Sequence, residues 1–386
     1  MTIDADVFQQ LLQMVSRFVR ERLIPLEAEV ARSDRVPEEI KQEMRDLGLF
    51  GLSIPAEYGG SGLNMEEEVQ VAFALGHTSP AFRSVFGTNN GIGAQGIVMD
   101  GTEEQKNYYL PRLATGEIIS SFALTEPEAG SDAASLRTSA RKDDDTYVLN
   151  GTKRFITNAP YADIFTLFAR TESSERPGGV VTAFLVEAKT PGLSLGKIDK
   201  KMGQAGSHTC DVIFDECRVP ASAVLGGKPG QGFKTAMKVL DRGRLHISAF
   251  CVGVAERLIQ DSLAYAMQRK QFGQPIIEFQ LIQAMLADSR AEAYAAKCMV
   301  LETARAKDRD ANVSTDTACC KMFASEMVGR VADRAVQIHG GAGYMEEYGI
   351  ERAYRDVRLF RIYEGTTQIN QILIARNMVK EAAAAA

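Results

Sequence analysis

The run Val180-Val181-Thr182-Ala183-Phe184-Leu185-Val186 decides the fold, because it gathers β-branched and aromatic residues in the middle of a chain whose two ends have helical patterns. Four similar short runs, broken by turn residues, stand nearby at residues 147–149, 154–157, 164–168 and 212–214. No helical pattern separates these runs, which argues against a parallel doubly wound sheet. We therefore expect a β domain of sandwich or barrel type over residues 119–225.

The part of the chain before this domain has the spacing of amphipathic helices. Apolar residues recur at positions 11, 12, 15, 18 and 19, and again at 40, 44 and 47 after Pro37, a residue type that often begins a helix. The Pro- and Gly-containing segment from Ile54 to Gly62 is expected to be a loop. The sequence therefore predicts an N-terminal helical domain over residues 1–118.

The part of the chain after the β domain returns to a helical period beyond the glycine-rich residues 226–232. The pairs Leu281/Met285 and Ile282/Leu286 are examples of this spacing. Long amphipathic patterns suit a four-helix bundle, and the closing alanines at 382–386 are expected to form a frayed tail. The predicted class is α+β, with domains at residues 1–118, 119–225 and 226–386.

The composition is that of a globular protein without an overall basic surface. The 386 residues are 45% hydrophobic and 24% charged, with a formal net charge of -6, so bulk attraction to nucleic acid or to anionic lipid is not expected. No stretch reaches the ~18 apolar residues of a membrane span, and the N-terminus lacks the basic and apolar regions of a secretion signal. We therefore expect a cytoplasmic protein with no nucleic-acid or membrane partner.

Cysteine and histidine form no pattern typical of a disulfide framework or a metal site. The six cysteines show no C-x-x-C spacing, and the neighbours Cys319 and Cys320 are poorly placed for an ordinary disulfide, which favours a reducing compartment. The four histidines lie far apart and outside any H-x-x-x-H or H-E-x-x-H pattern. We predict no metal.

Residues 91–96, Gly-Ile-Gly-Ala-Gln-Gly, spell the G-x-G-x-x-G pattern of loops that cradle dinucleotide phosphates. Such a loop needs a strand before it, a helix that opens at it and an acid about 20 residues later. Here both flanks have helical patterns. We therefore expect no nicotinamide site, and we interpret the glycines as residues that permit close helix packing.

Two other segments contain candidate catalytic or ligand-binding residues. Residues 361–369, Arg-Ile-Tyr-Glu-Gly-Thr-Thr-Gln-Ile, place one acid, Glu364, just before a helical pattern, where a carboxylate without a close cation could act as a base; the alternative is a solvated acid in a turn. Residues 123–135, Ala-Leu-Thr-Glu-Pro-Glu-Ala-Gly-Ser-Asp-Ala-Ala-Ser, offer hydroxyls and open amides to an anionic or heteroaromatic ligand. Residues 153–158, Lys-Arg-Phe-Ile-Thr-Asn, follow downstream. The alternative for this second pattern is a polar loop and a strand.

Together these segments resemble the acyl-CoA dehydrogenase family, in which a T-E-P-x-A-G-S-D segment and a W-I-T-N strand hold the flavin against a middle β domain. Further family-like segments follow in the same order as in the family. They are Glu57-Tyr58-Gly59-Gly60, Arg269-Lys270-Gln271-Phe272-Gly273, residues 337–344 (Gln-Ile-His-Gly-Gly-Ala-Gly-Tyr) and Tyr363-Glu364-Gly365-Thr366. The resemblance spans nearly the whole chain and implies the family's layout of helical, β and helical domains.

The resemblance also implies an FAD cofactor and the residues that contact it. On the chain that holds the flavin, these are Phe122, Leu124, Thr125, Gly130 and Ser131, with Phe155, Ile156 and Thr157 against the isoalloxazine ring. Phe155 departs from the family's usual Trp but keeps an aromatic face. Contacts to a neighbouring subunit's FAD are implied for Arg269, Gln271, Phe272, Gln280, Gln337 and Gly341, and contacts on the adenosine side for Thr366 and Gln368. Such shared sites imply an oligomer, and the resemblance implies a homotetramer, because the family is commonly a dimer of dimers.

For the reaction, the resemblance implies that Glu364 takes the α-proton of an acyl-CoA thioester while the β-hydrogen leaves as hydride to flavin N5, which gives a trans-2-enoyl-CoA. Hydrogen bonds to the thioester carbonyl would acidify the α-proton, and burial would raise the pKa of the carboxyl. Some relatives carry their base on the helix that here contains Gly243. A glycine has no side chain that could act as a base. Glu364 is therefore the single choice for the base.

The substrate-binding residues implied in this way are Ser131, Asp241, Arg244, Tyr363, Gly365 and Arg83. For Asp241 and Arg244, a charge pair on the helix surface is the alternative. Arg83 matches an Arg that glutaryl-CoA dehydrogenases use for the distal carboxylate, although Gly76 and Gly87 replace the Glu and Ser that assist it there. A structural ion pair is the alternative role, and a plain short acyl chain is the alternative substrate.

The main hypothesis is a flavin dehydrogenase of fatty acid β-oxidation that passes electrons to electron-transfer flavoprotein. A dicarboxylyl-CoA dehydrogenase, an oxidase and a desulfinase on the same scaffold are the enzyme alternatives, and the desulfinase is disfavoured because such enzymes lack the base kept here as Glu364. The non-enzyme alternative is a flavin-less scaffold that binds CoA thioesters. Thr125, Ser131 and Arg269 argue against that alternative.

Overall fold

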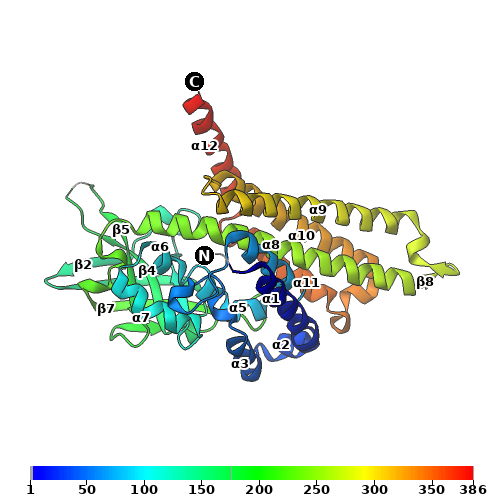
Figure 1. Cartoon of the computed structure of the whole chain (residues 1–386), viewed down its shortest axis with the longest axis horizontal. Coiled ribbons are helices and arrows are strands. Elements are labelled where there is room, and N and C mark those ends of the chain that lie inside the picture. The colour runs from blue at the N-terminus through cyan, green and yellow to red at the C-terminus, as the bar shows by residue number, and fades with distance from the viewer. Residues whose placement is uncertain (1–2, 175, 386) are drawn as a thin grey trace.

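The N-terminal part of the chain is helical, as its spacing predicts. The computed structural model describes residues 3–174 and 176–385. Its first helices are α1 (Ala5–Phe18), α2 (Glu27–Ser33), α3 (Glu38–Asp46), α4 (Met65–Leu75), α5 (Pro80–Asn90), α6 (Gln95–Asp100) and α7 (Glu103–Ala114). Polar caps begin several of them; Asn64 and Thr102, for example, each form a capping box with the residue three positions later. These helices wrap the lower side of the molecule in Figure 1.

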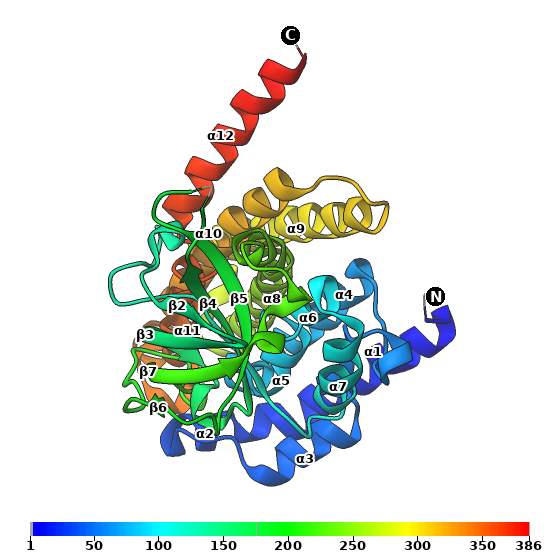
Figure 2. The same cartoon turned by 90° about the vertical axis from the view of Figure 1, so that its left-hand side faces the viewer.

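The middle part folds into one mixed seven-stranded sheet. Its strands are β1 (Ser120–Ala123), β2 (Ser139–Asp143), β3 (Thr146–Thr157), β4 (Ile164–Thr171), β5 (Val180–Glu187), β6 (Leu193–Leu195) and β7 (Thr209–Pro220). The order is β1-β4-β2-β3-β7-β6, and β5 pairs with β4. The strands β1 and β2 run parallel to β4, and the other pairs are antiparallel. Figure 2 shows the sheet facing the viewer.

The long strand β3 joins two runs that look separate in the sequence, residues 147–149 and 154–157. Its register against β7 shifts between Leu149 and Gly151 and again between Lys153 and Ile156. At the second shift the backbone of Phe155 is left-handed, with a φ of 58°, and its side chain is 62% exposed. A bulge re-aims a side chain from its strand, and here it turns an aromatic ring outward.

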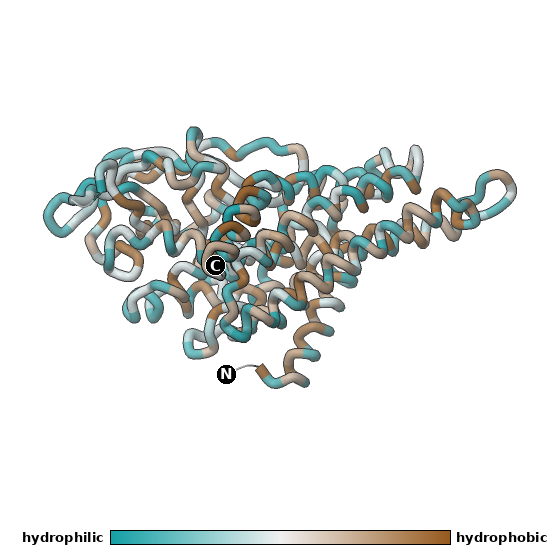
Figure 3. Tube along the Cα trace, turned by 90° about the horizontal axis from the view of Figure 1, so that it is seen from above, coloured by the Kyte–Doolittle hydropathy of each residue, from teal (hydrophilic) through white to brown (hydrophobic). Residues whose placement is uncertain are grey.

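The C-terminal part is built on three long helices, α8 (Gly232–Gln268), α9 (Gln280–Asp308) and α10 (Ser314–His339), followed by α11 (Ile350–Val357) and α12 (Thr367–Ala385). Hydrophobic and hydrophilic residues alternate along the long helices, as Figure 3 shows. A hairpin of β8 (Lys270–Gln271) and β9 (Gln274–Pro275) joins α8 to α9. The helix α12 begins beside α10 and then projects away from the molecule (Figures 1 and 2). The helix α12 therefore packs mainly on α10, and α4 from the N-terminal part packs against α8 and α9.

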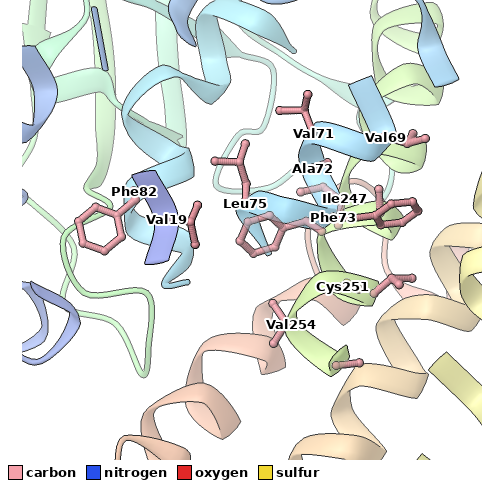
Figure 4. Packing of buried hydrophobic residues seen from close by; sticks show 14 of the residues in the cluster. Val19, Val69, Val71, Ala72, Phe73, Leu75, Phe82, Ile247, Cys251 and Val254 are labelled. Carbon is pink, nitrogen blue, oxygen red and sulfur yellow. The ribbon is translucent and has the colours of Figure 1, made fainter. Parts of the chain in front are cut away.

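The two helical parts share one hydrophobic core, which fixes the position of α8 against α4. Figure 4 shows Phe73 and Leu75 of α4 close to Cys251 and Val254 of α8. The helices cross so closely that a Cβ on Gly253 would lie 2.1 Å from the carbonyl oxygen of Phe73. The sheet has a core of its own, centred on β3, β4 and β7. The predicted order of helical, β and helical parts is confirmed.

The G-x-G-x-x-G segment lies in the turn between α5 and α6, so the strand that a dinucleotide loop requires is missing before it. A Cβ on Gly93 would meet the hydroxyl of Ser120 at 2.2 Å. This glycine therefore permits close packing against β1 and also against α5, where its Cβ would lie 2.9 Å from the carbonyl oxygen of Thr88. Within residues 3–174 and 176–385, no helix is both long enough and apolar enough to cross a membrane.

Candidate functional site

A cavity opens between the N-terminal helices, the sheet and α8. It encloses about 990 Å³ of empty space, part of which is open to solvent. Glu364 lines it together with Tyr363 from the turn before α12, Arg83 from α5, and Thr157 from the end of β3. Residues that are nearly 300 positions apart in the chain therefore face one space. Of the sequence-predicted site residues, Glu364, Tyr363, Arg83 and Thr157 line this cavity, whereas Ser131, Asp241, Arg244 and Gly365 do not.

The carboxyl group of Glu364 lies against the backbone of α8. A Cβ on Gly243 would be 2.6 Å from Oε2 and 2.8 Å from Oε1 of Glu364, so a side chain at position 243 would displace the carboxyl. The Oε2 atom is buried and has no hydrogen-bond partner among the described residues. Burial raises the pKa of the Glu364 carboxyl, and the charges of Arg83, Arg244 and Lys321 oppose that rise. Glu364 is therefore a half-buried acid with one buried carboxyl oxygen and a raised pKa, and a solvated turn residue is the wrong description.

Asp241 and Arg244 lie beneath the turn that carries Glu364. The Arg244 side chain is 7% exposed and pairs with Asp241, with 2.6 Å between Nη1 and Oδ1. Its Nε donates to the backbone carbonyl of Glu364 at 3.2 Å. The charge pair of the alternative is present, but it does not lie on the helix surface, because the guanidinium is buried and supports the turn.

Arg83 has no ion pair within the described part of the chain, so the alternative of a structural ion pair is also wrong. Its Nη2 lies 3.1 Å from Nδ1 of His246, and its guanidinium lies 5.9 Å from the centre of the Phe250 ring. Burial and the neighbouring charges of Arg83 and Arg242 lower the pKa of His246 well below its usual value. The imidazole is therefore neutral and accepts a hydrogen bond from the Arg83 guanidinium beside the cavity.

A second buried cation of the same cavity is paired. Arg242 of α8 makes a salt bridge with Glu68 of α4, whose side chain is 6% exposed. Burial raises the pKa of Glu68 to about 7, although Arg242 opposes the rise. Lys201 also lines the cavity and donates to the carbonyl of Ser207 at 2.6 Å. This wall of the cavity is therefore charged and polar. A bound ligand with a purely hydrocarbon chain would not need such a wall.

The segment that follows β1 is tied to β3 by a buried ion pair. Lys153 is fully buried, and its Nζ donates to Oε1 of Glu126 at 2.7 Å and to the carbonyl of Leu124 at 3.1 Å. Glu126 also accepts from the backbone N–H groups of Arg137 and Thr138. Burial lowers the pKa of Lys153 to about 8. The ion pair therefore fixes the segment that bears Thr125 and Ser131 to the strand that bears Phe155.

The residues predicted to contact FAD on the same chain fit a flat ligand laid against this surface. Phe155 presents an exposed ring, Gly130 and Ser131 are exposed, and Thr157 lines the cavity. A Cβ on Gly130 would meet no atom within 4 Å, so the backbone there is open to a ligand. The side chains of Phe122, Leu124 and Ile156 are buried. Those three can therefore meet a cofactor mainly through their backbone.

The other predicted FAD contacts gather elsewhere. Arg269, Gln271, Phe272 and Gln280 lie at the hairpin between α8 and α9, and Gln337 and Gly341 lie at the end of α10. Phe272 is 93% exposed. In Figure 1 this hairpin and the sheet are at opposite ends of the molecule. One chain therefore does not bring these residues to its own Phe155 and Thr157. Thr366 and Gln368 flank the start of α12, where the Thr366 hydroxyl accepts from the N–H of Ile369 at 3.2 Å.

Some residues of the site escaped the sequence analysis. His246 and Glu68 line the cavity, and Lys321 of α10 lies beneath the turn, where its Nζ donates to the carbonyl of Gly365 at 2.5 Å. The spacing of Arg242 and His246, four residues apart on α8, was a usable signal because it places both on one helix face. For Lys321 the signal was weaker, because a single lysine after Cys319 and Cys320 follows no motif.

Comparisons with known proteins match the three parts of the chain in order. The family models for the N-terminal, middle and C-terminal domains of acyl-CoA dehydrogenases match residues 6–117, 121–217 and 230–379. An acryloyl-CoA reductase (NADH) of Anaerotignum propionicum is 43% identical over 96% of this chain and 94% of its own length.

Two solved structures are also similar to this chain over nearly its whole length. Butyryl-CoA dehydrogenase of Megasphaera elsdenii has a TM-score of 0.91 and 37% identity, and the match covers 98% of this chain and 100% of that one. A glutaryl-CoA dehydrogenase of Mycobacterium smegmatis in complex with FADH2 has a TM-score of 0.91 and 30% identity, with 97% and 95% covered.

The buried pair of Lys153 and Glu126 gives a first prediction. Lys153→Met leaves the Glu126 carboxylate buried without its cation, which costs about 3–5 kcal/mol and loosens the segment around Thr125. We expect a lower thermal midpoint and a smaller fraction of purified protein that retains FAD, measured by the ratio of flavin to protein absorbance. Arg218→Met is the control, because its pair with Asp143 is exposed to solvent and contributes little to stability. Equal FAD retention in both variants would contradict the prediction.

Proposed function

We propose that this chain, which belongs to the acyl-CoA dehydrogenase family of FAD-dependent oxidoreductases, converts an acyl-CoA thioester to a trans-2-enoyl-CoA. The observation that carries this proposal is the enclosed Glu364 carboxyl, which faces the cavity without a hydrogen-bond partner among the described residues. Bound FAD supplies the acceptor for the β-hydride. The chain's own residues supply the base, the binding cavity and the exclusion of water.

Glu364 takes the α-proton in this proposal. A carboxylate with a raised pKa is a stronger base than one in water, and a missing hydrogen bond leaves Oε2 free to accept the proton. The nearby charges of Arg83, Arg244 and Lys321 favour the ionised form of the carboxyl. The α-proton of a thioester is still a weak acid, so we propose that the backbone N–H of Glu364 donates to the thioester carbonyl.

Glu364→Gln tests the base. Gln keeps the shape of the side chain but cannot take a proton, so we expect at least a hundredfold slower flavin reduction. The measurement is an anaerobic titration with straight, branched and dicarboxylic acyl-CoAs, in which bleaching of the oxidised flavin band is followed. Electron-transfer flavoprotein, the acceptor we propose, then restores the band. Equal bleaching by wild type and variant would remove Glu364 from the role of base.

The opposite direction is a second candidate function, because the acryloyl-CoA reductase shares 43% identity with this chain. The same base, once protonated, would return its proton to the α-carbon of an enoyl-CoA. The titration distinguishes the two directions. Bleaching by saturated thioesters supports the dehydrogenase, whereas rapid oxidation of pre-reduced protein by enoyl-CoA, with no bleaching by any saturated thioester, supports the reductase.

The acyl tail we propose is polar or acidic. Arg83 lines the cavity, has a neutral His246 as its hydrogen-bond partner, and carries a buried Nε without a partner among the described residues. A carboxylate at the end of the substrate would supply the missing charge. Gly76 cannot carry a side chain to assist Arg83, because its Cβ would lie 2.5 Å from the carbonyl oxygen of Phe250. Gly87 faces the guanidinium and leaves space for the substrate.

Arg83→Ala tests the tail. Loss of a charged hydrogen bond costs about 1.5–3 kcal/mol, so kcat/KM for glutaryl-CoA is expected to fall roughly tenfold to a hundredfold more than kcat/KM for butyryl-CoA. The ratio of the two values is the measurement, because any change in the pKa of Glu364 affects both substrates alike. An unchanged ratio would eliminate the charged tail and leave a plain short chain.

We also propose that the active protein is a homotetramer in which the hairpin after α8 reaches the FAD of a neighbouring chain. The exposed Arg269 and Phe272 at the far end of the bundle support this arrangement. Arg269→Glu replaces a cation that would face the FAD pyrophosphate and should lower FAD retention, with Arg290→Glu, an exposed residue of α9, as the control. Light scattering should give the mass of four chains. A monomer that retains FAD would contradict the arrangement.

A further inference from the structure

Lys321 of α10 is a fully buried cation without an ion pair within the described part of the chain. Its Nζ donates to the carbonyl oxygen of Gly365 at 2.5 Å. Burial lowers the pKa of Lys321 to about 8, and the charges of Glu364 and Glu326 oppose that fall while the charge of Arg244 adds to it. An ammonium is costly to bury without compensation. The hydrogen bond that compensates the burial of Lys321 is therefore made to the turn that bears the proposed base.

The turn at residues 363–366 has a backbone that requires support. Glu364 and Gly365 are both left-handed, with φ angles of 57° and 88°. A non-glycine residue in this region is strained. Side chains from outside the turn hold both of its central carbonyls. Arg244 donates to the Glu364 carbonyl at 3.2 Å, and Lys321 and Asn370 donate to the Gly365 carbonyl at 2.5 and 2.9 Å.

We propose that Lys321 is a positioning residue for the base: its ammonium fixes the Gly365 carbonyl, and thereby the orientation of Glu364, while its charge favours the ionised carboxylate. The inference rests on the proposed role of Glu364. Lys321 itself does not line the cavity where the substrate would bind. It acts on the reaction through the turn.

The charges around Glu364 come from three elements. Arg83 belongs to α5, Arg244 to α8 and Lys321 to α10, and all three favour the ionised carboxyl. Arg83 has its own partner in His246, and Arg244 is neutralised by Asp241. Glu326, an acid of α10 whose charge acts on Lys321, makes a salt bridge with Arg361 at 3.1 Å. Of these three cations, Lys321 is therefore the one whose charge acts mainly on the turn at residues 363–366.

Three variants separate the two parts of this role. Lys321→Met removes the charge and the hydrogen bond, Lys321→Gln removes the charge and keeps a donor, and Asn370→Ala removes a neutral donor to the same carbonyl. Lys297→Met is the control, because this lysine of α9 pairs with Glu256 away from the turn. The measurement is the rate constant of flavin reduction by a saturating acyl-CoA, followed by stopped flow across pH.

We expect different pH profiles from the variants. Without the Lys321 charge, the pKa of Glu364 rises, so the acid limb moves up by roughly one pH unit in Lys321→Met and Lys321→Gln. Without the full set of donors the base is misplaced, so the plateau falls about tenfold to a hundredfold in Lys321→Met and less in Asn370→Ala, whose limb stays in place. Lys297→Met should keep the wild-type profile. If Lys321→Met fails to fold, the other two variants still carry the test.

An acid limb and plateau that match wild type in Lys321→Gln and Asn370→Ala would overturn the inference. This outcome is distinct from failure of the proposed function, in which wild type itself shows no flavin reduction or Glu364→Gln reduces at the wild-type rate. An independent readout is the Kd of an enoyl-CoA product, measured by its perturbation of the flavin spectrum. It should change less than threefold in Lys321→Gln, because the lysine acts on the base rather than on binding.

Discussion

The site depends on one contact, the approach of the Glu364 carboxyl to the bare backbone of α8 at Gly243. A buried carboxylate without a hydrogen bond is unfavourable, and a left-handed glutamate adds roughly 1–2 kcal/mol of backbone strain. Both costs must be met by the rest of the structure. They are offset by Arg244, Lys321 and Asn370, which hold the carbonyls of the turn, and by the positive charges that stabilise the ionised carboxyl.

The helix α8 connects this contact to the rest of the fold. Gly243 lies under the carboxyl, His246 meets Arg83, and Gly253 allows α4 to cross in direct backbone contact. The wall of the cavity formed by α4 and α5 is therefore placed by the same helix that receives the base. The sheet completes the cavity through Thr157, and the Lys153–Glu126 pair keeps the neighbouring flavin-facing segment against β3.

Much of the layout could be predicted from the sequence, because helical and strand periods are local properties. The β-branched run at 180–186 predicts β5, and the spacing around Leu11 and Val15 predicts α1. The join of two short runs into β3 could not be predicted, since the bulges at Gly151 and Phe155 depend on pairing with β7. In the site, local motifs identify Glu364, Thr125 and Ser131. The roles of Arg244, His246 and Lys321 depend on contacts between residues up to about 160 positions apart, and no local pattern reports such contacts.

The most direct test of the central claim is whether Glu364 removes an α-proton, independently of hydride transfer. The measurement is exchange of the α-hydrogens of an acyl-CoA analogue whose β-carbon is replaced by sulfur, followed by NMR in deuterated water with the FAD-loaded protein. The account predicts exchange with wild type and none above background with Glu364→Gln. Exchange that persists at the wild-type rate in the variant would contradict it, because another group would then be the base.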